Sequence, residues 1–300
     1  MSKFFNVEHP LLPRITRTMA ETAARVTGET WQQAFMQLNA KRDEMIEREQ
    51  TDPLHYGYEP EAWHVADCLL GLPWVPAEEA EKVRQQWGFK KRVRVLMLNG
   101  GYRAGKTEYA AKRTVMILLW EKFERPKAWC FSVSADMSRE IQQPAIWKYL
   151  PAHLKDKEYR TPVRYISYKY KQGFAEDSFT LDNYGWCSFR NYNQEEDNVE
   201  GAAPLWVWLD EPPDPGLVKA LFGRIAERDG WMVLTFVPKH GYTATVKDFQ
   251  DSAETMATST AWLLPTDGGK PDLTRAFRRV PVGEWTRLRQ AATGGQEKAG

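Results

Sequence analysis

The sequence has few residues of the kinds that cross-link a chain or hold a transition metal. Three of its 300 residues are cysteines, and they stand far apart at Cys68, Cys130 and Cys187. This spacing resembles neither a disulfide framework nor a set of paired metal ligands, and it is typical of reduced cysteines in a core. The five histidines are also scattered, so a zinc site is not expected.

Long apolar stretches and a surplus of one charge are absent as well. No apolar run approaches the length of about 18 residues that spans a membrane, and the first residues lack the apolar segment of a signal peptide. We therefore expect a protein of a reducing cytoplasm with no membrane partner. The 41 basic and 40 acidic side chains give a net charge of +1, so composition alone indicates no nucleic-acid surface.

A glycine-rich turn between a strand pattern and a helix pattern is the most informative stretch that is present. Its residues Gly100 to Thr107 spell G-x-x-x-x-G-K-T, the full phosphate-loop pattern. Glycines let backbone N–H groups curl around phosphate oxygens, and the helix that follows adds partial positive charge. Lys106 is expected to reach the β- and γ-phosphates, and the Thr107 hydroxyl is expected to hold Mg²⁺.

The two flanks of this turn disfavour the alternative of a glycine turn that merely precedes a helix. The sequence therefore predicts a nucleoside triphosphate site with bound Mg²⁺. The predicted nucleotide-binding residues in and after the loop are Gly100, Gly101, Tyr102, Arg103, Ala104, Gly105, Lys106, Thr107 and Glu108.

An acidic pair follows the most hydrophobic run of the chain. Leu205–Leu209 is typical of a central parallel strand and ends in Asp210 and Glu211. Ligands in open α/β sheets bind at the carboxyl ends of the strands, where this pair should lie. We expect Asp210 to support Mg²⁺ and Glu211 to act as the general base for an attacking water. The alternative is an ordinary capping aspartate at a strand-to-helix turn.

Arginines and aromatic residues supply further candidates, each with a structural alternative. Arg103 lies inside the loop and can stabilise charge on a transferring phosphoryl group. Arg224 and Arg228, on the helix after the acidic pair, can act in trans from a neighbouring subunit, or they belong to a solvated helix face. Tyr58 and Trp63 precede the first strand and can pack on a nucleotide base, or they belong to the core.

The patterns along the chain alternate between strand and helix, which predicts a doubly wound α/β fold. The expected helices are Glu61–Leu70, Ala77–Trp87, Thr107–Phe123, Met137–Leu150 (interrupted near Pro144) and Leu217–Arg228. The expected strands are Val93–Leu98, Lys127–Ser134, Leu205–Leu209 and Trp231–Phe236. The sequence also predicts an exposed or edge strand at Val163–Tyr170, a hairpin from Ser178–Leu181 to Trp186–Phe189 and a last apolar element at Ala261–Leu264.

The first 50 residues are expected to be helical and peripheral. Trp31, Phe35 and Leu38 form an apolar stripe at helical spacing, and Glu44 and Arg48 form an i, i+4 pair. This segment is either a solvated helix that packs by one face or a docking arm for a partner. We therefore expect three parts: a helical N-terminal extension (1–55), a P-loop domain (56–265) and a partly disordered tail or linker (266–300).

Taken in order, these motifs resemble the ATPase domain of the large terminase subunit of tailed phages, over roughly Tyr56 to Phe249. GGYRAGKT is similar to the family's Walker A motif with its arginine inside the loop, and LWVWLDEPP is similar to its Walker B motif with the catalytic glutamate. LTFVP (Leu234–Pro238) resembles its coupling motif, with Thr235 as the γ-phosphate sensor. YGYEPEAWHVADCLL resembles its adenine-side segment without the usual glutamine, and VSADMSREIQQPAIWKYLP resembles the segment after the second strand.

The resemblance implies a P-loop NTPase fold of the RecA-like (ASCE) type, with a mainly parallel central sheet flanked by helices. It implies an ATP-hydrolysing motor that uses Mg²⁺ and translocates double-stranded DNA into a viral procapsid, in the cytoplasm of the host cell. The implied partners are a portal protein, a small terminase subunit and further copies of the chain in a ring.

The chain departs from the family pattern at two places. NQEEDNVEG, before the acidic pair, is acidic where relatives commonly carry an arginine, so a trans arginine would have moved to Arg224 or be absent. The acids after Gln250 are too few and scattered for the family's nuclease domain, so we expect no DNA cleavage by this chain.

Two other classes of function remain open at the level of the sequence. Another P-loop translocase or helicase would separate strands without a capsid partner. An ATP-dependent assembly module would bind the nucleotide and recruit partners with little turnover, which single-turnover hydrolysis with Glu211 intact distinguishes from a motor.

Overall fold

The computed structural model describes residues 14–56, 59, 61–89, 91–99, 105–156, 161–192, 203–237, 244–245, 256–258 and 278–280. The apolar element predicted at 261–264 lies outside these ranges, and so does most of the tail predicted for 266–300. Among the described residues, no helix combines the length and the apolar character needed to cross a membrane.

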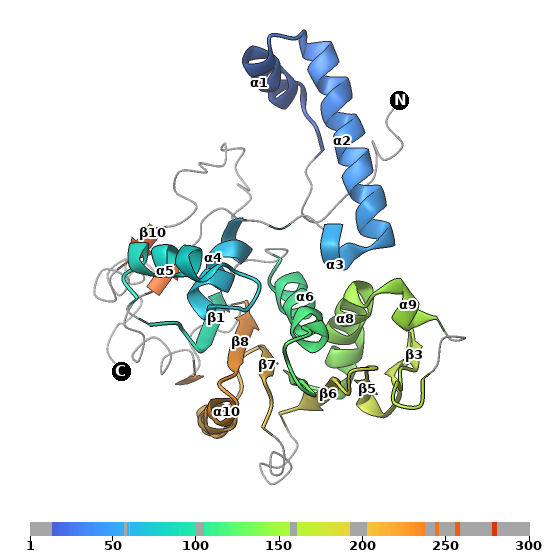
Figure 1. The fold of residues 1–300 in the computed structure, drawn as a ribbon, viewed down its shortest axis with the longest axis vertical. Helices are drawn as coiled ribbons and strands as arrows, with labels where there is room; N and C mark the ends of the chain where they lie inside the picture. Colours follow the sequence, from blue (N-terminus) through green and yellow to red (C-terminus); the bar gives the residue numbers. More distant parts are fainter. Residues whose placement is uncertain are drawn as a thin grey trace, which may run out of the picture.

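The helices begin and end close to the predicted positions (Figure 1). A π-helical turn (Ser138–Gln142) joins two of them. The described α-helices are α1 (Arg17–Thr27), α2 (Trp31–Thr51), α3 (Pro53–Tyr56), α4 (Glu61–Leu70), α5 (Ala77–Gln86), α6 (Lys106–Leu119), α7 (Ala135–Met137), α8 (Gln143–Tyr149), α9 (Ala152–Lys155) and α10 (Pro215–Glu227).

A six-stranded sheet forms the centre, in the order β1-β8-β7-β2-β6-β5. Its neighbours pair in parallel except β5 and β6, which form the predicted antiparallel hairpin. The prediction of an α/β protein with a mainly parallel central sheet flanked by helices is therefore confirmed. The strands of this sheet are β1 (Val95–Asn99), β2 (Lys127–Ser132), β5 (Ser178–Thr180), β6 (Trp186–Asn191), β7 (Trp206–Asp210) and β8 (Trp231–Phe236).

Two small antiparallel pairs lie outside the central sheet. One joins β3 (Tyr168–Lys169) to β4 (Gly173–Phe174), and the other joins β9 (Met256–Thr258) to β10 (Arg278–Val280). The second pair lies at the end of the predicted P-loop domain and within the predicted tail.

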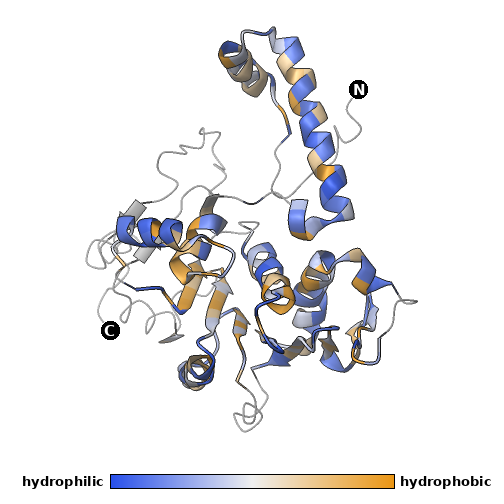
Figure 2. Ribbon diagram, viewed as in Figure 1, coloured by the Kyte–Doolittle hydropathy of each residue, from blue (hydrophilic) through white to orange (hydrophobic). Residues whose placement is uncertain are grey.

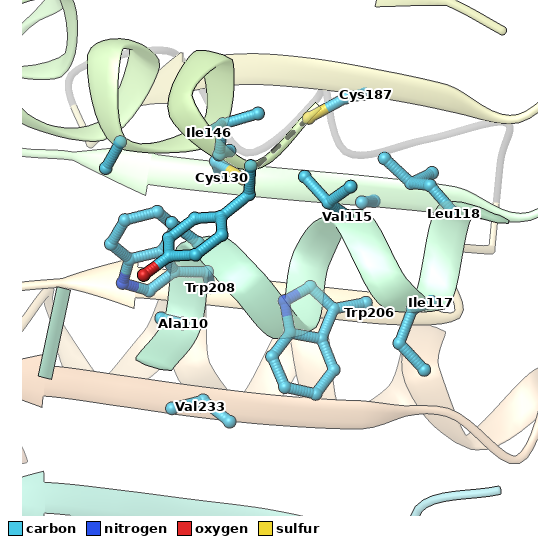
Figure 3. Packing of buried hydrophobic residues seen from close by; sticks show 14 of the residues in the cluster. Ala110, Val115, Ile117, Leu118, Cys130, Ile146, Cys187, Trp206, Trp208 and Val233 are labelled. Carbon is cyan, nitrogen blue, oxygen red and sulfur yellow. Dashed lines mark hydrogen bonds between the residues drawn. The ribbon is translucent and has the colours of Figure 1, made fainter. Parts of the chain in front are cut away.

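Alternation along the central strands divides the core into two faces. Trp206 and Trp208 of β7 belong to the cluster that includes buried residues of α6 and α8, whereas Val207 and Leu209 belong to the cluster with α10. Figure 3 shows both tryptophans on the side of the sheet where Ala110 of α6 lies. Because side chains alternate, Asp210 continues the row of Trp206 and Trp208 toward α6.

The N-terminal extension is helical, as predicted, from Arg17 onward. The stripe of Trp31, Phe35 and Leu38 packs against a small cluster of alanines on α1 and α2, so this face is covered by α1 and not by the central core. The predicted Glu44–Arg48 ion pair is present at 2.7 Å. In Figures 1 and 2 the α1–α2 pair projects from the rest of the described molecule, and α2 is largely hydrophilic.

Two local predictions differ from the structure. The edge strand expected at Val163–Tyr170 is reduced to a bridge at Tyr165 and the two residues of β3. The Arg164 guanidinium, which is buried, donates to the carbonyls of His153 and Asp156 and so ties this segment to the end of α9. The interruption expected near Pro144 is a π-helical turn, Ser138–Gln142, which runs into α8 with Pro144 in the first turn of that helix.

The cysteines are free and buried, in agreement with the prediction of reduced core residues. Two of the three cysteines lie close together in the structure although they are far apart in the sequence. Cys130 on β2 and Cys187 on β6 lie on adjacent strands with their sulfurs 3.9 Å apart (Figure 3).

Candidate functional site

The predicted phosphate loop leads from the end of β1 to the start of α6. Gly105 caps α6 with φ 75° and ψ 9°, a left-handed conformation that glycine adopts without strain. Lys106 and Thr107 are the first two residues of the helix. Five predicted binding residues, Gly100, Gly101, Tyr102, Arg103 and Ala104, lie outside the described residues, as does Tyr58.

The strand order places the carboxyl ends of three strands, β1, β8 and β7, next to one another. β8 lies between β1 and β7, although it is the last of the three in the sequence. Asp210 at the end of β7 pairs in register with Thr235 of β8, and Leu98 of β1 pairs with Thr235 on its other side. The carboxyl ends of β1, β8 and β7 therefore meet beside the start of α6.

Thr235 is almost completely buried, and its hydroxyl connects β8 to the acidic pair. It lies 2.9 Å from Asp210 Oδ1, to which it donates, and it accepts from Trp208 Nε1 at 2.9 Å. The hydroxyl therefore fixes the Asp210 carboxylate in one orientation. Sequence reasoning placed Thr235 in the site by resemblance but did not foresee these two partners.

Glu211 has an unusual backbone conformation. Its φ is 69°, in the left-handed region that non-glycine residues rarely occupy. Such a residue costs roughly 1–3 kcal/mol and persists where the surroundings determine it. The Glu211 N–H donates to the Thr235 carbonyl at 2.8 Å, and the Tyr192 hydroxyl lies 2.7 Å from the Glu211 carbonyl. Glu211 is therefore held by β8 on one side of β7 and by Tyr192, which follows β6, on the other.

The charges of the acidic pair act on Lys106. Burial lowers the pKa of Lys106, while the negative charges of Glu211 and Asp210 act in the opposite direction. Burial also raises the pKa of Asp210 from 3.8 to about 6; the Glu211 charge adds to this rise, and the Thr235 hydrogen bond and Lys106 oppose it. The three charged groups thus form one electrostatic unit in a site of reduced solvation.

The donor set at this edge fits a hard cation. The Thr107 hydroxyl and the Asp210 carboxylate supply oxygen atoms, which Mg²⁺ prefers, and Mg²⁺ in nucleotide sites takes its remaining ligands from phosphates and water. In the described part of the chain, no group of three or more His, Cys, Asp or Glu side chains is arranged to hold a metal. The residues present therefore fit a metal that arrives with a phosphate ligand.

Two predicted site residues lie away from this edge. Trp63 on α4 is 4% exposed and packs edge-on against Tyr109 with ring centroids 5.7 Å apart, so the structure supports the core alternative over a base-stacking surface. Arg224 lies in the last turn of α10, where it pairs with Glu227 at 3.2 Å. In its own subunit it therefore belongs to a solvated helix face; a role in trans stays a prediction.

The end of α10 lies near the amino ends of the strands, opposite to the carboxyl ends where the acidic pair lies. Arg228 donates to the carbonyls of Glu124 and Arg125, which precede β2. Glu108, another predicted binding residue, directs its carboxylate toward α8, where Lys148 Nζ lies at 2.9 Å and the Tyr149 hydroxyl also donates to it. Its side chain thus serves helix packing at the base of the site.

Sequence reasoning missed a second charged cluster on α6. Lys112 and Arg113 are buried, at 2% and 0% exposure, within a run of mostly apolar residues. Arg113 binds Asp67 and Glu59, and three aromatic rings surround it. Two adjacent basic residues within an otherwise apolar helix were the available signal, because such charges require buried partners.

Comparison with known proteins gives limited information. No protein-family model matches the sequence, and no curated protein is similar to it. One solved structure that is similar is a mutant of the ATPase domain of the large terminase from Thermus phage P74-26, with a TM-score of 0.37 and 17% identity over 57% of this chain and 74% of that chain. A likeness this low identifies neither the family nor the activity of this chain, so the functional conclusion depends on the site.

Proposed function

We propose that this chain is a P-loop ATPase of the RecA-like type that hydrolyses ATP at the carboxyl edge of β1, β8 and β7. The observation that carries the proposal is the strand order, which pairs Asp210 with Thr235 and brings the carboxyl ends of β1, β8 and β7 beside Lys106 at the start of α6. The charges of Asp210 and Glu211 act on Lys106 at this place. The sequence pattern G-x-x-x-x-G-K-T supports nucleotide binding at the same place.

Each residue has a distinct role in the proposed reaction. Lys106 stabilises negative charge on the β- and γ-phosphates, and Glu211 orients a water molecule and accepts its proton as the water attacks the γ-phosphorus and ADP leaves. Thr107 and Asp210 would hold Mg²⁺, which neutralises phosphate charge when bound. Arg103 would stabilise charge on the transferring group, and Thr235 would report loss of the γ-phosphate through its bond to Asp210.

We further propose that hydrolysis drives translocation of double-stranded DNA into a procapsid by a ring of these chains on a portal, with a small terminase subunit as a partner. The ordered resemblance of GGYRAGKT, LWVWLDEPP and LTFVP to large terminases supports this finer proposal. The rival proposals are another P-loop translocase or helicase and an assembly module with little turnover.

The decisive test is the Glu211→Gln substitution, which removes the base and keeps the side-chain shape. We expect kcat for ATP hydrolysis to fall by about 10²–10⁴-fold, the usual contribution of a general base, with little change in ATP affinity. Turnover is measured by phosphate release and affinity by titration with a fluorescent nucleotide. Glu21→Gln, on the partly exposed surface of α1, is the matched control and should leave both unchanged.

Unchanged turnover in the Glu211→Gln protein would contradict the assignment. If the unmodified chain binds ATP but does not hydrolyse it in a single turnover, the assembly module is favoured. Stimulation of turnover by duplex DNA supports the translocase, and strand separation without a capsid partner favours a helicase.

A further inference from the structure

Tyr192, immediately after β6, reaches the acidic pair across the intervening strand β2. Its N–H donates to the Ser132 carbonyl at the end of β2, at 3.1 Å. Its ring stacks on Phe131 of β2, with ring centroids 6.3 Å apart and planes inclined by 4°. These contacts fix both the backbone and the ring of Tyr192 on the face of the sheet that α10 covers.

The Tyr192 hydroxyl ends at the backbone of Asp210 and Glu211. It lies 3.0 Å from the Asp210 carbonyl and 2.7 Å from the Glu211 carbonyl, so its single proton is shared between two acceptors, with the shorter distance to Glu211. Burial is the main cause that raises the pKa of Tyr192 well above its ordinary value, and the charges of Asp210 and Glu211 add to it. The hydroxyl therefore keeps the proton that it donates.

This contact completes the restraint of a residue in an unfavourable conformation. The Glu211 N–H is bound by the Thr235 carbonyl of β8, and the Glu211 carbonyl is bound by Tyr192. With φ of Glu211 at 69°, the direction of its side chain depends on both flanking peptide groups keeping these orientations. Without the hydroxyl, the carbonyl has lost the partner that opposes relaxation toward an ordinary extended backbone.

We propose that Tyr192 is a positioning residue that holds the Glu211 backbone in its left-handed conformation and so aims the Glu211 carboxylate at the attacking water. This inference rests on the proposed function of Glu211. It assigns no direct contact with nucleotide to Tyr192, because the hydroxyl is used by the two carbonyls. The proposed role depends on the Tyr192 hydroxyl alone, so a substitution that removes the hydroxyl and keeps the aromatic ring tests it.

The test is Tyr192→Phe, which removes the hydroxyl and keeps the stacking on Phe131. We expect kcat for ATP hydrolysis to fall by about tenfold or more, since small displacements of a catalytic group cost up to about 10²-fold. The KM for ATP and the affinity for a non-hydrolysable ATP analogue should change by less than about twofold. Tyr170→Phe removes a phenol oxygen from a side chain that is 83% exposed and serves as the matched control.

A double-mutant comparison separates positioning from a general loss of structure. If Tyr192 acts through Glu211, Tyr192→Phe should lower the residual single-turnover rate of the Glu211→Gln protein by less than about twofold. A tenfold loss in both backgrounds, or a rise in KM with kcat retained, would overturn the inference. The inference would also be overturned if the single variant Tyr192→Phe were fully active while the single variant Glu211→Gln were inactive. Full activity of Glu211→Gln would instead contradict the proposed function.

Discussion

Helix α6 carries two clusters of charge, and they are built in opposite ways. At its start, Lys106 lies in the field of Asp210 and Glu211, at the edge of the sheet. Two turns later, the Arg113 guanidinium binds Asp67 Oδ2 at 2.7 Å and Glu59 Oε1 at 2.7 Å, inside the molecule. The first cluster lies where the predicted phosphate-loop sequence enters α6, and the second joins α6 to α4 and to the segment before it.

The carboxylates of the two clusters show how differently their charges are compensated. Burial alone would raise the pKa of Glu59, but hydrogen bonds and charge from Arg113, followed by Lys112, outweigh it and hold the pKa at about 2. Burial dominates at Asp210, whose pKa is raised to about 6. Burial also dominates at Asp67, whose pKa is raised although Arg113, Trp74 and Tyr109 oppose the rise. Of these three carboxylates, Glu59 alone has a lowered pKa. At Asp210 a bound cation would supply the missing positive charge.

The largest expected effect comes from removing the centre of the structural cluster. Arg113→Met keeps much of the apolar stem but leaves the buried Asp67 without its cationic partner and Glu59 with Lys112 alone, which should lower the free energy of unfolding by about 3–5 kcal/mol. Chemical denaturation measures this change. Arg17→Met, at an ion pair whose arginine side chain is 70% exposed, should cost less than about 1 kcal/mol. Equal losses of stability for Arg113→Met and Arg17→Met would show that the buried cluster stabilises the fold no more than an exposed ion pair does.

The substitution Asp210→Asn should raise the free energy of unfolding, in contrast to Arg113→Met. Because the pKa of Asp210 is raised in the folded state, its stabilising contribution is present below pH 3.8 and is lost as the pH rises through about 6. Asparagine can still accept the Thr235 hydrogen bond and carries no charge, so the variant should be more stable by about 1–3 kcal/mol at pH 8, with ATP hydrolysis lost.

The pH series is the measurement that checks this prediction. The stability difference between Asp210→Asn and the unmodified chain should grow from pH 4 to pH 6 and then remain constant. A variant that is less stable at pH 8 would show that the site compensates Asp210 without a ligand.

Glu59→Gln should give the smallest effect, with the reverse dependence on pH. The lowered pKa of Glu59 means that its ionised form stabilises the fold above pH 4.5 and that this contribution is lost as the pH falls toward about 2. The Glu59 side chain is 34% exposed, so solvent screening limits the expected loss to about 0.5–1.5 kcal/mol at pH 7. Thermal unfolding at pH 7 and pH 3 should show this loss at pH 7 and less of it at pH 3.

Much of the fold could be predicted because its elements are long, apolar runs with clear boundaries. Trp231–Phe236 is a strand over the predicted residues, and Leu205–Leu209 corresponds to β7 shifted by one residue. The segment Val163–Tyr170 alternates as a strand would, yet the Arg164 side chain binds the carbonyls of His153 and Asp156, and the segment forms only a bridge and the two residues of β3. Local alternation does not encode such a contact.

The sequence by itself determined the chemistry of neighbouring residues: a lysine and a threonine after a glycine turn, and two carboxylates after a buried strand. Only the tertiary structure decided that β8 lies between β1 and β7, which sets the Thr235 hydroxyl against Asp210 across 25 positions of chain. The same holds for Tyr192 at the Glu211 carbonyl and for the buried partners of Arg113. Strand order and long-range hydrogen bonds depend on the packing of the whole sheet, and periodicity within a segment carries no information about them.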